Sequence, residues 1–490
     1  MRTRWWLVLV ALVVSALVSP GNFGSVDTVR RLQVARSIRL GEPEVTDVEF
    51  GITGKDGRRH AWFGLGQSLV LVPFDAAVSA TISPFLVRAK LNAEKQEQVR
   101  DLLIAFLMQF VITSLILILA DQILRSYGFT PLASAAGTLA LLFGTTCLQY
   151  VQSAQENNLL LMLDLGALWA IRRWQRDGGF WAVVAGACCG FAILTRLPSV
   201  LETLIFAVLA VGDQGLWRRF LSGYVPPVIT AIAVDRWYHW IRFHELFSTY
   251  ISIWGRQFAP RGAPASFPFS YPFWKGFWGT FLSPDKSVIL FDPLLLVVAA
   301  LAIWRWRKLE RDLRVTLLWL FALLFGYAAG YARYYDFGGD AAWGHRFVVV
   351  PVQLLALFSV PLLLAHGKAA RPSWKAGAWV LVAVSVVFQW VSTTIAPPVE
   401  IVQIKRGYAH GVLWNRAVNL IELASGREEP ARFKDVPAEW QTLYFFPFQL
   451  RFRYPRLAVW AVAMWSGLLF CLALLVHRTL RAAQRDVTLH

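Results

Sequence analysis

Long apolar runs, separated by short polar junctions, recur along the whole of this chain. A helix of about 20 apolar residues crosses the hydrocarbon core of a bilayer, so runs of this kind indicate membrane spans. The composition agrees, because 56% of the 490 residues are hydrophobic and the mean hydropathy is +0.48. The sequence therefore predicts an all-α membrane protein, a polytopic helical bundle of about 12 transmembrane helices.

We expect a single domain over residues 1–490, with three long loops at 21–100, 242–286 and 396–456. The expected membrane segments are Trp5–Pro20, Leu102–Leu124, Pro131–Val151, Leu159–Ile171, Phe180–Thr195, Val200–Val211, Tyr224–Trp240, Val288–Trp304, Val315–Tyr331, Val348–Ala365, Ala376–Ile395 and Leu457–Val476.

Basic residues mark every second junction, and the net charge is +17. These junctions lie at 2–4, 125, 172–176, 218–219, 305–314, 368–375 and 478–485. Cytoplasmic loops carry an excess of Lys and Arg, so both termini are expected in the cytoplasm and the long loops outside. The pattern indicates membrane lipids as partners, at the cell inner (plasma) membrane, and no nucleic acid.

One apolar run, Gly64–Phe85, is ambiguous. It contains Gln67, Pro73 and Asp75, and a full crossing there would move every later basic junction outside. We therefore expect an interfacial or re-entrant segment at the outer surface. The four cysteines lie in or beside apolar runs, so neither a disulfide framework nor a thiolate metal site is expected.

Asp27 stands six residues beyond Gly21, where the first apolar segment ends. An acidic residue at the mouth of a membrane bundle is a candidate functional residue. A local alternative is that Ser25 caps a helix and Asp27, in its first turn, pairs with Arg31 at i,i+4.

Three further charged residues lie in or beside the fourth and fifth segments. Glu156 opens the fourth segment on the same expected side as Asp27, and Asp164 lies about two turns deeper. Arg196 ends the fifth segment on that side, against the charge bias. Its alternatives are snorkelling to lipid phosphate and bidentate binding of a phosphate ligand.

The turn Tyr334–Phe347 combines aromatic residues with Asp336, Asp340, His345 and Arg346. Arg346 opens the tenth segment and is a second candidate anion ligand. No metal-binding spacing occurs in this turn, so no metal ligands are assigned, although a divalent metal is left open as a cofactor. No nucleotide-binding motif or nucleophile elbow occurs elsewhere.

The order of these motifs resembles the GT-C superfamily of integral-membrane glycosyltransferases, the group that includes bacterial protein O-mannosyltransferases and the lipid A aminoarabinose transferase. The similar stretches are GNFGSVDTVRRLQVARSIRLGEP, HAWFGLGQSLVLVPFD, AQENNLLLMLDLGALWAIRR, CCGFAILTRLPSV, FLSPDKSVILFDPLL and FGGDAAWGHRFVVVPVQLL. Two departures occur. Asp27 is followed by Thr28 where the family often has a second acid, and Gly64-Leu-Gly replaces a Pro-Pro.

The resemblance implies transfer of a sugar, with inversion, from a polyprenyl-phosphate donor to a hydroxyl of a glycan, lipid or protein acceptor on the outer face. Asp27 would be the general base, with Glu156 as the other catalytic candidate. Arg196 and Arg346 would bind the donor phosphate. We assign the acceptor or sugar pocket to Gln67, Asp340 and His345.

Three other functions remain as alternatives: a secondary transporter, an oligosaccharide polymerase of the inner membrane, and a non-catalytic scaffold. Transporters bind substrate at the midplane between internal repeats. This chain shows no internal repeat, and its charges concentrate at one expected face. Nothing in the sequence separates a transferase from a polymerase.

Overall fold

A computed structural model describes residues 2–45, 51–211, 217–339, 342–369, 371–408, 411–425, 431–437 and 440–487. Within these ranges helices predominate, and a single hairpin of β1 (Ile52–Thr53) and β2 (Arg59–His60) is the only sheet. The predicted all-α class is confirmed.

Every predicted apolar segment is helical over most of its length. The corresponding helices are α1 (Arg2–Val18), α5 (Ala93–Ser126), α6 (Pro131–Phe143), α7 (Cys147–Ser153), α8 (Glu156–Asp177), α9 (Trp181–Thr195), α10 (Val200–Val211), α11 (Trp217–Phe243), α14 (Val288–Phe291), α15 (Leu294–Arg305), α16 (Arg311–Tyr331), α17 (Val349–Ala356), α18 (Ser359–His366), α19 (Pro372–Ser392) and α23 (Pro455–Val487).

Five described helical stretches are long and apolar enough to cross a membrane, and a sixth qualifies if the bent pair of α6 and α7 is one span. The five are Ala93–Ser126, Arg311–Tyr331, Val349–His366, Pro372–Ser392 and Pro455–Asp486. Helices α9 and α10 are apolar but only 15 and 12 residues long. The count of twelve crossings therefore stays a prediction.

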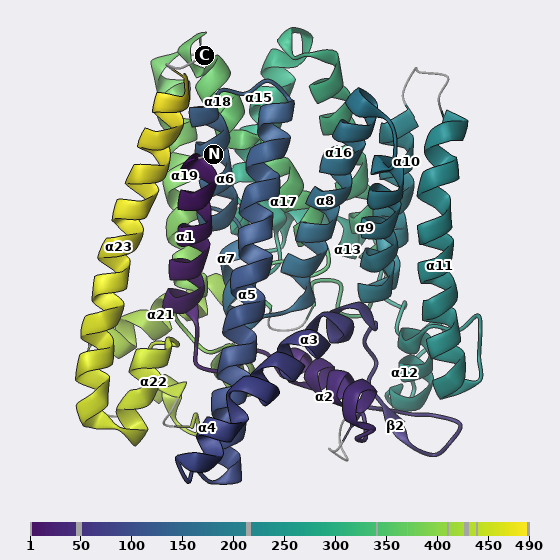
Figure 1. The fold of residues 1–490 in the computed structure, drawn as a ribbon, viewed down its shortest axis with the longest axis vertical. Coiled ribbons are helices and arrows are strands. Elements are labelled where there is room, and N and C mark those ends of the chain that lie inside the picture. The colour runs from purple at the N-terminus through teal and green to yellow at the C-terminus, as the bar shows by residue number, and fades with distance from the viewer. Residues whose placement is uncertain are drawn as a thin grey trace.

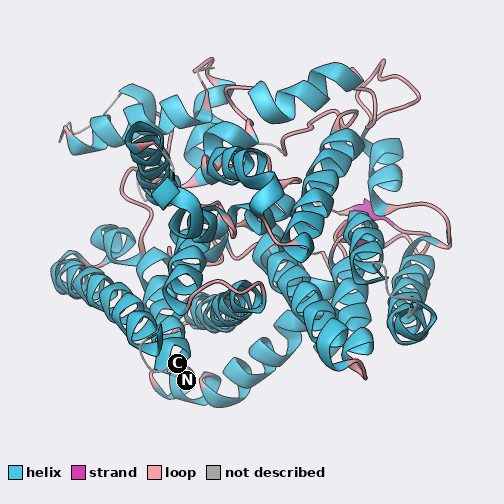
Figure 2. Ribbon diagram, turned by 90° about the horizontal axis from the view of Figure 1, so that it is seen from above, coloured by secondary structure: helices cyan, strands magenta, loops and turns pink. Residues whose placement is uncertain are grey.

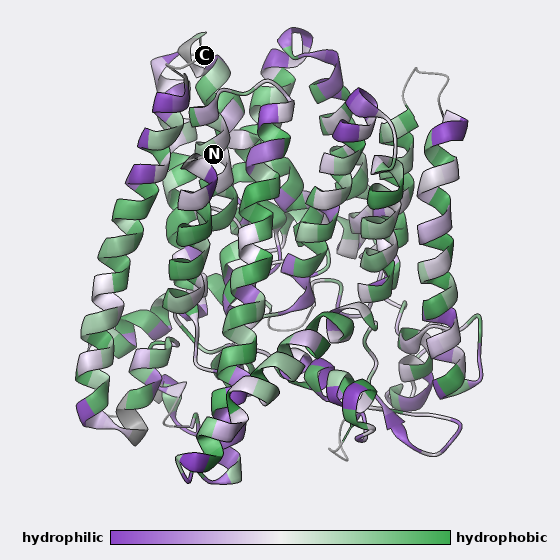
Figure 3. Cartoon of the chain, viewed as in Figure 1, coloured by the Kyte–Doolittle hydropathy of each residue, from purple (hydrophilic) through white to green (hydrophobic). Residues whose placement is uncertain are grey.

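The long helices run side by side, and both termini lie at one end of the bundle (Figures 1 and 2). Thr3 of α1 donates a hydrogen bond to Asp486 near the end of α23, with 2.9 Å between the oxygens. Hydrophobic residues cover the middle of the long helices, and hydrophilic residues concentrate toward the two ends (Figure 3). This banding is expected of helices that cross a bilayer.

The opposite end, which we call the loop end, carries most of the short elements of the three long loops (Figure 1). The short helices of these loops are α2 (Val26–Leu40), α3 (Gly66–Thr81), α4 (Ser83–Arg88), α12 (Tyr250–Phe258), α13 (Phe273–Leu282), α20 (Pro397–Lys405), α21 (Val412–Ala424) and α22 (Phe446–Arg453).

Helix α3, the ambiguous apolar run, lies obliquely across the loop end beside α2 (Figure 1). Its Asp75 is buried and contacts two arginines of α2, Arg36 at 3.2 Å and Arg39 at 2.5 Å. Arg36 also contacts Glu97 of α5 at 2.6 Å. A buried carboxylate needs such partners, and this ion network fixes the face of α2 that points into the bundle.

Candidate functional site

Four charged residues that are far apart in the sequence meet at the loop end. Arg346 Nη2 lies 2.5 Å from Asp27 Oδ2 and 3.6 Å from Glu156 Oε1. Arg196 Nη2 lies 2.5 Å from the same Glu156 oxygen. The structure therefore brings together Asp27, Glu156, Arg196 and Arg346, the proposed base candidates and phosphate ligands.

A fifth residue, Arg31, completes this charge cluster. Its Nη2 lies 2.7 Å from Glu156 Oε2, and its guanidinium stacks over the Phe63 ring at 4.2 Å. The local alternative, in which Ser25 caps the helix and Asp27 pairs with Arg31, therefore predicts the wrong hydrogen bonds. Ser25 is the N-cap residue but makes no side-chain cap bond, and Asp27 bonds Arg346 on a distant segment.

Arg196 owes its position to the end of α9. It is the C-cap residue, with extended backbone at φ −150° and ψ 114°, and Pro198 follows in the first turn of a 3-10 helix. Proline has no N–H to continue the hydrogen bonds of α9 and disfavours α-helix at the residue before it, so α9 ends here and the chain turns. Gly66 of the first loop packs against this end so closely that an added Cβ would lie 2.1 Å from Thr195 Oγ1.

Glu156 is the first residue of α8, and the preceding turn holds it in place. Ala154 has a left-handed backbone with φ 52°, and its carbonyl oxygen accepts hydrogen bonds from Thr28 Oγ1 at 3.0 Å and Gln67 Nε2 at 2.7 Å. Gln67 is thus buried behind the site as a structural support. It is not among the residues that line the cavity described below.

Arg346 lies in the turn between α16 and α17. Its backbone N–H donates to Gly338 at 3.1 Å, and its carbonyl accepts from Asn157 Nδ2 of α8 at 2.9 Å. The next residue, Phe347, stacks on Tyr331 with ring centroids 4.5 Å apart. These contacts tie the turn to both α8 and α16, so the Arg346 side chain is directed at Glu156 and Asp27.

The charge cluster forms part of the wall of a cavity of about 480 Å³. Nine aromatic residues also line it: Trp62, Phe63, Tyr250, Phe269, Tyr327, Tyr331, Tyr334, Tyr335 and Phe347. Asp336 is a further acidic residue of the wall. An aromatic cavity of this size with a few convergent polar groups is typical of a small-molecule site.

The two carboxylates of the cluster differ in their surroundings. Glu156 is buried, and its two oxygens face three guanidinium groups. Asp27 contacts one arginine and keeps 24% of its side chain exposed. Glu156 therefore serves as the counter-charge that holds the arginines, and Asp27 is better placed to accept a proton from a bound molecule.

The arginines retain unused donors. Nε and Nη1 of Arg31, and Nε of Arg346, are buried without a hydrogen-bond partner among the described residues. A buried donor left unpaired costs about 1–3 kcal/mol. The cluster also holds three guanidinium groups against two carboxylates. Both features favour an anionic oxygen as a ligand.

Of the remaining predicted residues, His345 is buried and is not among the cavity-lining residues. Its ring lies between Phe337 and Phe347, and burial together with the charge of Lys286 lowers its pKa to about 3. The imidazole is therefore neutral near pH 7. Asp340 lies outside the described residues.

Asp164 of α8 is buried deeper in the bundle, and its carboxylate oxygens find no hydrogen-bond partner among the described residues. Nearby Glu202 of α10 accepts a hydrogen bond from Tyr327 at 2.5 Å. Neither acid lines the cavity. In the described part of the chain, no group of three or more His, Cys, Asp or Glu residues is arranged to hold a metal ion.

Comparisons with protein-family models, with curated proteins and with solved structures give no match to this chain. The charge cluster and the cavity are therefore the features from which a function can be inferred.

Proposed function

We propose that this chain is an integral-membrane glycosyltransferase that moves a sugar from a polyprenyl-phosphate donor to an acceptor hydroxyl, with inversion. The observation that carries the proposal is the charge cluster, in which three arginines and a partly exposed carboxylate share the wall of one aromatic cavity. Such a transfer needs a cationic site for the leaving phosphate and a base for the acceptor.

The chemistry follows from these two parts. The Asp27 carboxylate takes the proton of the acceptor hydroxyl as its oxygen bonds to the anomeric carbon. The bond between that carbon and the phosphate oxygen breaks, and the polyprenyl phosphate leaves with one additional negative charge. Arg196 and Arg346 stabilise this charge, and Arg31 supplies unused N–H donors beside them. A phosphate leaving group needs no general acid, so one carboxylate suffices.

The topology belongs to the same proposal. With about 12 crossings and basic junctions in the cytoplasm, both termini are cytoplasmic and the loop end faces outward at the inner membrane. The cavity then opens where a donor lipid presents its phosphate on the outer face. Thiol labelling of Glu94→Cys and Gln484→Cys, with Cys471 replaced, tests this. An impermeant reagent should label the first in intact cells and spare the second.

The buried acids Asp164 and Glu202 favour a second candidate, a proton-coupled secondary transporter. Acidic residues inside a membrane bundle often mark ion pathways. The fate of the substrate distinguishes the two functions. A transferase forms a new glycosidic product in detergent micelles, whereas a transporter acts only across a sealed bilayer. An oligosaccharide polymerase would use the same site with a longer glycan.

The most informative experiment compares surface glycans and lipid A by mass spectrometry between a deletion strain and its parent. A missing sugar would identify the product, and the corresponding polyprenyl-phosphate sugar would then be supplied to the purified protein. Unchanged glycans and lipids under growth conditions in which the protein is made would count against the transferase.

A further inference from the structure

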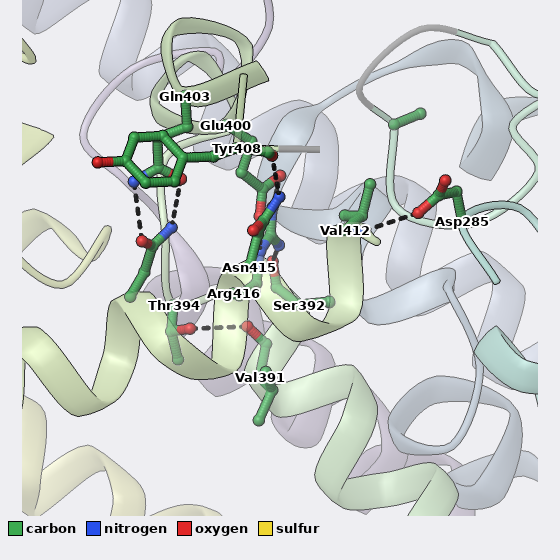
Figure 4. A network of polar contacts seen from close by, with 12 residues as sticks. Asp285, Val391, Ser392, Thr394, Glu400, Gln403, Tyr408, Val412, Asn415 and Arg416 are labelled. Atoms are coloured by element: carbon green, nitrogen blue, oxygen red, sulfur yellow. Dashed lines mark hydrogen bonds and ion pairs between the residues drawn. The ribbon is translucent and has the colours of Figure 1, made fainter. Parts of the chain in front are cut away.

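The described residues between 396 and 437, which we call the cap, form a small helical unit at the loop end with its own apolar core. The guanidinium of Arg416 on α21 joins the cap to the rest of the bundle, and it lies beside Glu400 and Ser392 (Figure 4). Arg416 and Glu400 of α20 are fully buried and form a bidentate pair at 2.6 and 2.7 Å. Arg416 Nη1 also donates to the Ser392 carbonyl. Two parallel charge-assisted hydrogen bonds fix the plane of the guanidinium.

That fixed guanidinium lies against the turn that carries Arg346. Its central carbon is 4.8 Å from the centroid of the Trp343 ring, and Trp343 is buried with its ring edge-on to Phe291 at 5.0 Å. Trp343 precedes Arg346 by three residues. An arginine over a desolvated tryptophan face is among the stronger cation–π contacts.

Two further bonds hold the same region. The Val412 N–H, at the start of α21, donates to Asp285 at 3.2 Å (Figure 4). The adjacent Lys286 donates to the carbonyl of Ala342 at 2.9 Å. The segment 342–346 is therefore held between the cap and α14, while none of the described cap residues lines the cavity.

We propose that Arg416 and Trp343 are positioning residues, which hold segment 342–346 so that Arg346 meets the donor phosphate. This inference rests on the proposed function, because it assigns the phosphate to Arg346. It adds that one contact of the cap, Arg416 on Trp343, influences the affinity of the site, although none of the described cap residues lines the cavity. A displacement of about 1 Å in a binding group is enough to matter at such a site.

The test uses full-length protein in detergent micelles, with undecaprenyl phosphate as the probe. Arg416→Lys removes the bidentate pair and the planar stack, and Trp343→Leu removes the aromatic face. We expect the Kd for the probe to rise about tenfold in both variants, because misplacing a positioned group costs up to 100-fold. Trp343→Phe keeps an aromatic face and should recover most of the affinity.

The matched control is Gln403→Leu. Gln403 and Asn419 form a reciprocal amide pair between the same two helices, at 2.8 and 2.9 Å, and both are fully buried. This variant destabilises the cap without touching Trp343, so it should leave the probe affinity near the wild-type value. Hydrogen exchange of segment 342–349 should accelerate in Arg416→Lys and not in Gln403→Leu.

Equal probe affinity and equal exchange in Arg416→Lys and Gln403→Leu would overturn the inference. Arg346→Ala, measured alongside, distinguishes a failure of the phosphate site from a failure of the positioning role. If Arg346→Ala leaves the affinity unchanged, the proposed phosphate site is wrong. If only Arg346→Ala weakens binding, the site stands and the positioning role fails.

Discussion

The charge cluster at the cavity and the Glu400–Arg416 pair in the cap both place arginine against a buried carboxylate. They differ in the number of positive charges that face each carboxylate. In the cap one arginine meets one glutamate, and both are closed off from solvent. At the cavity Glu156 faces three arginines, Asp27 stays partly exposed, and some arginine N–H donors have no partner in the part of the chain that the structure describes. The cap pair is neutral and its charges are compensated. The cavity cluster has an excess of positive charge and unpaired donors, which an anionic ligand would compensate.

The largest effect on activity should come from Asp27, the partly exposed carboxylate. Asp27→Asn keeps shape and polarity but removes the proton acceptor, so turnover by purified protein should fall roughly 10²–10⁴-fold while probe binding persists. Glu94→Gln, an exposed acid in the same loop, is the control and should retain activity. Near-normal turnover by Asp27→Asn would reject Asp27 as the base and leave Glu156 as the next candidate.

The second prediction compares the two buried glutamates. Glu400→Gln leaves Arg416 buried with no counter-charge, and the free energy of unfolding should fall by about 3–5 kcal/mol. Glu156→Gln should cost less, because Asp27 remains as a counter-charge and the three arginines line a cavity rather than a closed core. Denaturant unfolding in micelles measures both. Equal losses of unfolding free energy would mean that the cavity cluster is shielded from solvent as fully as the cap pair.

The smallest predicted effect, on stability at low pH, concerns a third acid–arginine contact, which lies beside the β-hairpin. Glu44 lies 3.6 Å from Arg242 and 3.4 Å from His60. Burial raises the pKa of Glu44, but the hydrogen bond from His60 and the charge of Arg242 outweigh it, so the folded-state pKa is below the ordinary 4.5. The pair therefore stabilises the fold above pH 4.5, and this contribution is lost as the pH falls through the lowered pKa.

Glu44→Gln should accordingly flatten the decline of the melting temperature below pH 4.5 and lower the melting temperature slightly at pH 7. A variant that declines with acid as steeply as the wild type would show that Glu44 does not contribute. Glu245→Gln, at the exposed pair with Arg256, is the control for a surface contact and should have little effect.

The fold class and most residues of the charge cluster could be predicted from the sequence. The ion pairs that these residues form with one another could not. Apolar runs predict helices because burial of a helix face leaves a local pattern, and Asp27, Glu156, Arg196 and Arg346 each border such a run. Arg31 was interpreted as a partner of Asp27 because i,i+4 spacing is visible locally. Its actual contact with Glu156 depends on how α2 packs on α8.

The positions of Gln67 and His345 also depend on tertiary packing, which the sequence does not show. Both lie close to the cavity in the chain, but the rotation of α3 and the path of the turn before α17 place them behind its wall. The cap pair was not predicted, because Glu400 and Arg416 lie in a long polar loop with no periodic pattern. Their 16-residue separation becomes a contact only when α20 packs on α21.

The most direct test of the central claim compares undecaprenyl phosphate with uncharged undecaprenol as ligands of the purified protein. The phosphate should bind more tightly, and Arg196→Ala and Arg346→Ala should each remove about 1.5–3 kcal/mol of that preference. Lysine at either position should restore part of it, because it keeps the charge without the planar fork. Equal affinity for the two lipids, unchanged in both alanine variants, would contradict a phosphate site at this cluster.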